Sequence, residues 1–229
     1  LQDIEPDNDP KTSDGIEVYA PNHSVKVGDI VEAEGRVAEF IGDGYNDRFD
    51  TDLPMTQLSK PSVTVIENDL NKVPAPVEIA GDTIPADLIK EGTLDNYDPT
   101  KYSLDWWESV EGMIVNIKSG TIVGPQLHGD IYLLPSDTNE TLNNLGGYTL
   151  KANENPNVIP VMMGNPGRSF VAKAGDKIVS DIYGPVRYSF GAHKIDIPVD
   201  KVKAAFEKGN SEPESTNIVP DESKLTVVS

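Results

Sequence analysis

Short segments in which apolar and polar residues alternate account for most of this chain. The clearest are "GIEVY" (15–19), "SVTVIE" (62–67) and "GDIYLLP" (129–135), each close to residues that favour turns. Alternation over four to eight residues between turn-forming residues is typical of half-buried β-strands. The same pattern predicts further strands in residues 30–40, 56–59, 112–124, 156–163 and 193–199.

Helical spacing is confined to two short segments. "DPTKYSLDWWESVEG" (98–112) predicts a helix with Ser103 as its N-cap, and residues 200–209 have helical spacing but are short enough to be irregular. Trp106 and Trp107 are consecutive, so we expect one to fill a seam between domains and the other a domain core. Because strands and turns dominate, the sequence predicts an all-β fold with long loops and one or two short helices.

One turn-and-strand pattern occurs twice. "VKVGDIVEAEGRVAEFIG" (25–42) and "AKAGDKIVSDIYGPVRYSFG" (172–191) share K-x-G-D and then G-x-V-x4-G, and each follows a strand with an aromatic residue. A duplicated β domain explains this agreement, and chance similarity between two strand–turn–strand units is the alternative. The matched positions are Lys26 with Lys173, Gly28 with Gly175, Asp29 with Asp176, Gly35 with Gly184, Val37 with Val186 and Gly42 with Gly191.

The repeated pattern predicts a particular architecture. A turn, a long strand bent at glycine and a hairpin are typical of five-stranded Greek-key barrels of the OB type. "GMIVNIKSG" (112–120) would be the first strand of the second barrel, whereas no such strand precedes the first copy. The sequence therefore predicts tandem OB-like Greek-key barrels. Their expected bounds are an OB-like domain without its first strand in 1–80, a connector in 81–104, a second OB-like domain in 105–200, and a helix or linker in 201–229 that leads to a further domain.

Composition narrows the function classes. The 229 residues include no cysteine, which excludes disulfides, thiolate catalysis and cysteine zinc sites. The formal net charge of −19 repels phosphate backbones, whereas nucleic-acid-binding proteins are usually basic. No apolar run approaches the 18 residues of a membrane span. A chain that starts with "LQDIEPD" is expected to be processed or to be part of a longer polypeptide.

Five segments resemble a known family, in the family's order. They are "LQDIEPDNDPKTSDGIEVY", "VKVGDIVEAEGRVAEF", "GYNDRFDTDLPMTQLS", "ESVEGMIVNI" and "YGPVRYSFGAHKI". They are similar to the non-catalytic N-terminal region of bacterial secreted nucleases of the endonuclease/exonuclease/phosphatase superfamily, in which OB-like domains precede the catalytic domain. The closing "ESKLTVVS" resembles the first strand of that catalytic domain.

The resemblance implies a function without catalysis in this chain. It implies a secreted, extracellular bacterial protein whose accessory region positions a downstream, metal-dependent catalytic domain of the same polypeptide and aids contact with DNA. The family's catalytic residues have no matching positions here, so none is carried over, and we expect no nuclease activity. A divalent cation between acidic loops and phosphates would offset the charge repulsion.

Candidate binding residues fall in three segments. The loop at the start of the chain predicts Ca²⁺ binding through Asp3, Asp7, Asp9 and Asp14, with a solvated acidic turn as the alternative. In "GDGYNDRFDTD" (42–52), Asp43, Asp47, Asp50 and Asp52 are a second oxygen-rich set, and a packed hairpin loop is the alternative. For nucleic acid, the residue types that stack bases and pair with phosphates gather in Arg187, Tyr188, Phe190 and Lys194, with a core role as the alternative for the aromatic residues. His23, His128 and His193 show no ligand spacing.

Two further function classes remain open. A structural or adhesive extracellular module could form homo-oligomers by strand addition at the open edge of the incomplete barrel, with no nucleic-acid role. A carbohydrate-binding β domain would need exposed aromatic residues on a flat face. Strong acidity and the lack of a basic groove favour the first of these two alternatives.

Overall fold

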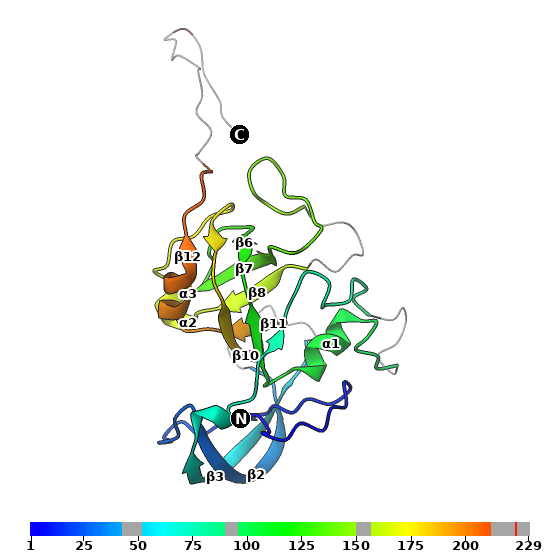
Figure 1. The fold of residues 1–229 in the computed structure, drawn as a ribbon, viewed down its shortest axis with the longest axis vertical. Coiled ribbons are helices and arrows are strands. Elements are labelled where there is room, and N and C mark those ends of the chain that lie inside the picture. Colours follow the sequence, from blue (N-terminus) through cyan, green and yellow to red (C-terminus); the bar gives the residue numbers. More distant parts are fainter. Residues whose placement is uncertain (43–51, 90–95, 150–156, 212–222, 224–229) are drawn as a thin grey trace.

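The computed structural model describes residues 1–42, 52–89, 96–149, 157–211 and 223. Its strands form two sheets, joined by short helices and long connections (Figure 1). The predicted all-β fold is confirmed, because the described helices are all short. None of these helices has the length and the apolar composition to cross a membrane.

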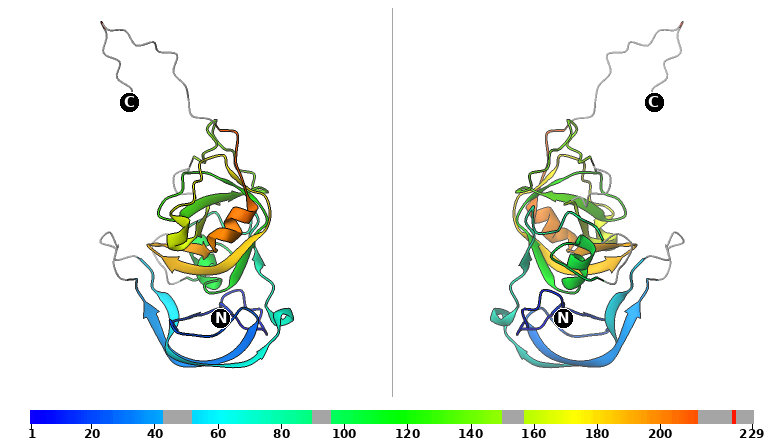
Figure 2. Two further views of the ribbon diagram at one scale, coloured as in Figure 1. Left: turned by 90° about the vertical axis from the view of Figure 1, so that its left-hand side faces the viewer. Right: turned by 90° about the vertical axis from the view of Figure 1, so that its right-hand side faces the viewer.

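The N-terminal sheet has three strands in the order β1-β3-β2, namely β1 (Glu17–Val18), β2 (Asp29–Phe40) and β3 (Met55–Asn68). Strand β1 runs parallel to β3, and β2 pairs with β3 as a long antiparallel hairpin. Figure 2 shows this hairpin as a curved ribbon with the start of the chain on its concave side. The predicted strands in 56–59 and 62–67 are one strand, bent at Lys60, where φ is 51°, and at the register shift between Glu34 and Arg36.

The C-terminal sheet has the order β12-β9-β6-β7-β8-β11-β10-β5-β4. The predicted tandem OB-like Greek-key barrels are not confirmed: the strands form one three-stranded and one nine-stranded sheet, and taken strand by strand neither order returns to its first strand. The strand bounds are β4 (Val77–Glu78), β5 (Ile114–Ile117), β6 (Gly120–Ile122), β7 (Asp130–Pro135), β8 (Ile159–Met162), β9 (Lys177–Ile178), β10 (Ile182–Ser189), β11 (Ala192–Asp196) and β12 (Phe206–Glu207).

The helices are η1 (Leu70–Lys72), α1 (Ser103–Ser109), α2 (Gly164–Gly167) and α3 (Val199–Ala205). The prediction of Ser103 as an N-cap is wrong. Ser103 is the first residue inside α1, and the capping position is Tyr102, which makes no side-chain cap. The backbone N–H of Ser103 donates to the carbonyl of Asp87, so a distant segment satisfies the start of this helix.

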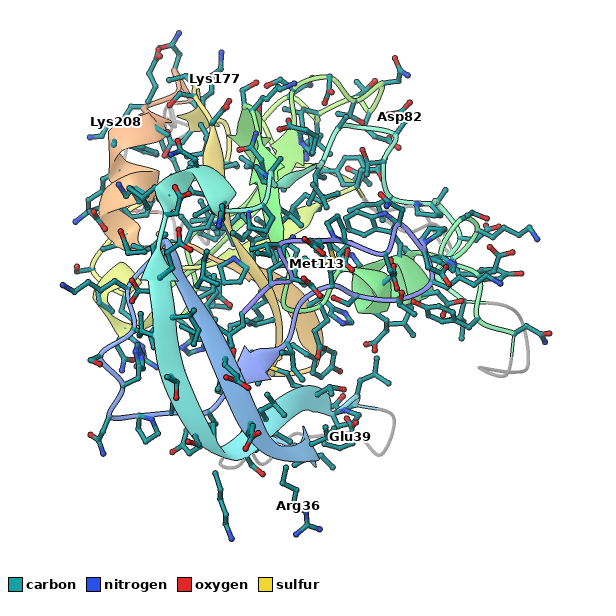
Figure 3. All side chains as sticks on the ribbon, turned by 60° about the horizontal axis from the view of Figure 1, so that its bottom comes forward. Arg36, Glu39, Asp82, Met113, Lys177 and Lys208 are labelled. Atoms are coloured by element: carbon teal, nitrogen blue, oxygen red, sulfur yellow. The ribbon has the colours of Figure 1, made fainter. Side chains whose placement is uncertain are left out.

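The hydrophobic core belongs to the C-terminal sheet. Val115, Ile131 and Ile195 are fully buried in it, and Ile79 and Ile84, just before and within the predicted connector, pack there too. Trp107 lies in this core and Trp106 packs against it, with 4.9 Å between the two ring centroids, so both rings contribute to the same cluster. Met113 lies near the middle of the molecule, whereas Arg36 and Glu39 lie at its outer edge on β2 (Figure 3). Val37 and Ile66 of the N-terminal sheet are each 61% exposed.

The repeated K-x-G-D turn has the same local structure in both copies. The Asp29 carboxylate accepts a hydrogen bond from the Lys26 N–H at 2.7 Å, and the Asp176 carboxylate accepts one from the Lys173 N–H at 2.9 Å. Gly28 has φ of 91° and Gly175 has φ of 90°, a conformation that favours glycine. The two sequence copies therefore encode one turn twice.

Candidate functional site

Three side chains with metal-binding or proton-exchanging groups converge where helix α1 meets strand β11. His193 Nε2 lies 3.0 Å from Glu108 Oε1 and 3.9 Å from Glu111 Oε2. Among the residues that the structure describes, this is the one group in which three such ligand atoms lie within 4.8 Å of one another. We refer to Glu108, Glu111 and His193 as the seam cluster.

Local structure explains how the two carboxylates come to the same place. Glu108 lies in the last turn of α1, and Glu111 follows two residues after the helix ends at Ser109. The Glu111 N–H donates a hydrogen bond to the Glu108 carbonyl at 3.3 Å, so the turn that ends α1 keeps the two residues close to each other. His193 is brought opposite them by the β10–β11 hairpin, where it pairs with Tyr188.

The seam cluster connects the two sheets. The second oxygen of the Glu111 carboxylate, Oε1, accepts a hydrogen bond from the Thr56 N–H of β3 at 2.9 Å. The Glu111 carbonyl accepts another from Ser13 Oγ, in the acidic loop, at 2.6 Å. Glu111 thus contacts both the C-terminal site and the N-terminal sheet, which places the cluster at their junction.

Aromatic rings enclose the imidazole. Trp107 stacks on His193 with 6.0 Å between ring centroids, and the Tyr188 ring meets it edge-on at 5.0 Å. The His193 residue is only 5% exposed, whereas the Glu108 side chain is 37% exposed. Solvent and small ions therefore have a route to the cluster on the Glu108 side.

Glu111 is the carboxylate of the cluster whose pKa is shifted. Burial, with the neighbouring Glu108 charge as the second cause, raises the pKa of Glu111 to about 7. Glu111 therefore releases its proton at a higher pH than an exposed glutamate does. Glu108 Oε1, Glu111 Oε2 and His193 Nε2 are all buried, and although Nε2 and Glu108 Oε1 face each other at 3.0 Å, none of the three makes a hydrogen bond of regular geometry.

The two cations predicted to contact DNA are occupied by carboxylates. Arg187 on β10 pairs with Asp196 at 3.1 Å and with Glu17 of β1 at 3.2 Å. Lys194 on β11 is buried and pairs with Asp130 at 2.6 Å. Both side chains are therefore engaged in ion pairs, and their contact with DNA stays a prediction.

The two aromatic residues of that set have different surroundings. Tyr188 accepts a hydrogen bond from the Leu53 N–H at 3.0 Å and packs on His193, so it is part of the structure of the seam. Phe190 is 65% exposed in a conformation with φ of 51°, and Lys194 Nζ lies 5.6 Å from its ring centroid. Of the four predicted residues, Phe190 alone presents a large exposed surface.

The predicted calcium loop is stabilised by its own backbone. Asp3, Asp7 and Asp9 each accept a hydrogen bond from an N–H two residues further on, and Asp14 accepts one from the Asp7 N–H. These are the contacts of a solvated turn rich in aspartate. Calcium binding by this loop stays a prediction. Of the second acidic set, Asp43, Asp47 and Asp50 lie outside the described residues.

A hollow of about 580 Å³ lies on the concave side of the N-terminal hairpin. Its lining is mostly apolar and includes Ile4, Ile16, Val31, Ala33 and Leu58. In the β1-β3-β2 order, β2 pairs on one side with β3, and no described strand pairs with its other side. This hollow and the free side of β2 are adjacent.

Sequence reasoning missed the seam cluster. The only local signal was the three-residue spacing of Glu108 and Glu111, which is common in exposed helices. His193 shows no ligand spacing to the other two histidines, His23 and His128. Only the packing of α1 against β11 brings it to the two carboxylates.

Comparison with known proteins gave one match. A family model described as a domain of unknown function (DUF8508) matches residues 65–205. The matched region starts within β3, ends at the last residue of α3 and includes all three residues of the seam cluster. Neither the curated proteins nor the solved structures contain a match.

Proposed function

The chain belongs to the DUF8508 family, and since that family carries no stated activity, we propose a function from the chain itself. The chain is a non-catalytic accessory region of a bacterial secreted nuclease. Its two OB-like units position a catalytic domain of the same polypeptide. The observation that carries the proposal is the repeated strand unit, which supports two similar β units. The nuclease role is inferred from the resemblance of five segments, in the same order, to such nucleases.

Strand pairing supports an OB-like arrangement in the C-terminal sheet. Strands β5 and β6 are separated by only two residues, and β9 and β10 by only three. We count each of these two pairs as one long, interrupted strand, here called a segment. Counted in this way, and together with β7, β8 and β11, the open nine-strand order reduces, between β12 and β4, to five segments, of which the third and fifth (β8 and β11) are parallel. A partly open five-stranded Greek-key barrel has this number of strands and this continuity.

The N-terminal sheet repeats three of these five segments. Strand β1 is parallel to β3 as β8 is to β11, and the β2–β3 hairpin corresponds to β10–β11. The counterpart of "GIEVY" is therefore β8 rather than "GDIYLLP", which forms β7. In the place of β7, Leu1 and Ile16 exchange backbone hydrogen bonds, and the Asp3 N–H donates another to the Asp14 carbonyl.

The ion pairs of Arg187 and Lys194 favour a positioning role over direct DNA binding. Arg187 and Lys194 are held by carboxylates, and the net charge of −19 opposes a phosphate backbone. We therefore expect the purified chain with Mg²⁺ to leave plasmid DNA intact and to bind labelled single-stranded DNA weakly or not at all. Plasmid degradation by a preparation free of contaminating nuclease would overturn the proposal.

Fluorescence anisotropy over a salt series tests the residual DNA contact. Phe190 is the exposed aromatic residue of the predicted set, and Val171, 82% exposed, is a matched control position. Binding that weakens with salt and is reduced in Phe190→Ala, but not in Val171→Ala, adds DNA contact to the accessory role. Absence of binding at low salt leaves positioning as the function.

The free side of β2 favours a second candidate, self-assembly by strand addition. Two copies of β2 could pair antiparallel about a two-fold axis and cover both hollows. Because β2 is acidic, such a dimer should become stronger with salt. Light scattering after size exclusion should then show a dimer that Ala33→Lys, in the hollow, abolishes and Val171→Lys preserves. A monomer at all salt concentrations excludes this candidate.

A further inference from the structure

We propose that the seam cluster binds one divalent transition-metal ion, of the class of Zn²⁺ or Mn²⁺, through Glu108, Glu111 and His193. The ion would fix the end of α1 to β11 and, through Glu111, to the N-terminal sheet. This site is separate from the acidic loop at the start of the chain and from any catalytic metal of a neighbouring domain.

The first support is the unsatisfied state of the three facing atoms. In the part of the chain that the structure describes, seven buried side-chain nitrogen and oxygen atoms have no hydrogen-bond partner, and three of the seven are Glu108 Oε1, Glu111 Oε2 and His193 Nε2. Buried polar groups without a partner are rare and costly. His193 Nε2 and Glu108 Oε1 face each other at 3.0 Å without hydrogen-bond geometry, and Glu111 Oε2 faces the same point, so the three atoms share one place where an ion would satisfy them together.

The second support is geometric. His193 Nε2 is 3.0 Å from one carboxylate oxygen and 3.9 Å from the other, and all three atoms lie within 4.8 Å of one another. Ligand atoms bound to one ion at about 2.0–2.2 Å lie roughly 3.0–3.5 Å apart. The His193–Glu108 separation lies in this range and the His193–Glu111 separation exceeds it, so a rotation of the Glu111 side chain would bring its oxygen to the ion.

The ligand types select the class of metal. Imidazole nitrogen and carboxylate oxygen together suit Zn²⁺ and related transition metals, whereas Ca²⁺ prefers six to eight oxygen ligands. The rings of Trp107 and Tyr188 limit the movement of His193, and the Thr56 N–H holds the far oxygen of Glu111. Such outer contacts orient the ligands of metal sites. Water can complete the coordination from the exposed Glu108 side.

Metal binding to the whole chain tests the proposal. Chain stripped with EDTA is titrated with Zn²⁺, Mn²⁺ and Ca²⁺ by calorimetry, and Co²⁺ absorption reports the coordination. We expect one Zn²⁺ or Mn²⁺ per chain and a Co²⁺ spectrum of low coordination number. Glu108→Gln keeps the shape of a partly exposed side chain, so the fold should be preserved. It should weaken metal affinity at least about 100-fold, which is more than is lost when a residue that only orients a metal ligand is replaced.

Two controls separate the cluster from surface binding. His23 and His128 are exposed and lie outside the cluster, so the double variant His23→Ala/His128→Ala should bind like the parent chain. His193→Gln should lose binding, and if it fails to fold, Glu108→Gln still decides. The proposal is overturned if no transition metal binds, if Glu108→Gln binds as the parent does, or if removing the exposed histidines abolishes binding.

Discussion

Lys194 and Asp130 form a buried ion pair between strands β11 and β7. Their side chains are 8% and 12% exposed, and their charged atoms are 2.6 Å apart. The cost of removing two charges from water is offset only while both are present. At the scale of single residues, Lys194 and Asp130 thus depend on each other inside the C-terminal sheet.

Asp130→Ala should lower the free energy of unfolding by about 3–5 kcal/mol, because it leaves the Lys194 charge buried and unpaired. Urea denaturation of the purified chain measures the change. Lys72→Ala is the matched control, since the Lys72–Glu67 pair is exposed, with its charged atoms 3.5 Å apart. The control should stay within about 1 kcal/mol of the parent. Equal small losses in both variants would contradict a structural role for the buried pair.

At the scale of elements, glycine sets the contact between β10 and its neighbour. A Cβ atom on Gly184 would lie 2.1 Å from the Asp196 carbonyl oxygen of β11, and backbone atoms cannot yield as a flexible side chain can. In the first copy, a Cβ on Gly35 would lie 3.2 Å from the Ser59 oxygen. The matched glycines of the repeat therefore both lie where a long strand passes close to the backbone of its hairpin partner.

Gly184→Ala should destabilise the chain by about 1–3 kcal/mol or more, because β10 and β11 must separate to admit the new methyl group. Gly124→Ala is the control, since a Cβ there meets nothing within 4 Å. It should change stability by less than about 0.5 kcal/mol. Thermal unfolding followed by circular dichroism compares the two, and a stable Gly184→Ala variant would show that the strands are not this close.

At the scale of the whole molecule, polar contacts join two sheets, and the apolar side chains of the C-terminal sheet are buried more completely than those of the N-terminal sheet. The described core lies in the C-terminal sheet, while the N-terminal hairpin keeps large apolar residues exposed. Arg187 links the sheets by pairing with Glu17 on β1 and with Asp196 on β11. The N-terminal sheet should therefore depend on this seam for its order.

Arg187→Ala should speed amide exchange in β1–β3 by about fivefold or more, with a smaller effect in β5–β8, because charged hydrogen bonds contribute roughly 1.5–3 kcal/mol. Hydrogen exchange read by mass spectrometry resolves the two sheets. Lys118→Ala removes an exposed pair with Glu78 inside the C-terminal sheet and should change neither. Uniform acceleration in both sheets would mean that the seam is not the weaker link.

Local patterns in the sequence determined the parts of the fold that depend on neighbouring residues. Alternation predicted the strands, since a strand side chain changes face at every residue. The K-x-G-D turn was predictable as one unit because Asp29 and Asp176 bond to amides three residues before them, and Gly28 and Gly175 adopt positive φ. The resemblance to secreted nucleases, and the function proposed from it, also come from the sequence alone.

The tertiary structure decided which side chains are available for chemistry. Arg187 and Lys194 meet carboxylates 170 and 64 residues away, and the sequence gives no local sign of either pairing. His193 reaches Glu108 and Glu111 only because α1 packs on β11. Long-range contacts depend on how whole elements pack, so the seam cluster became visible only in three dimensions, whereas the repeat was readable along the chain.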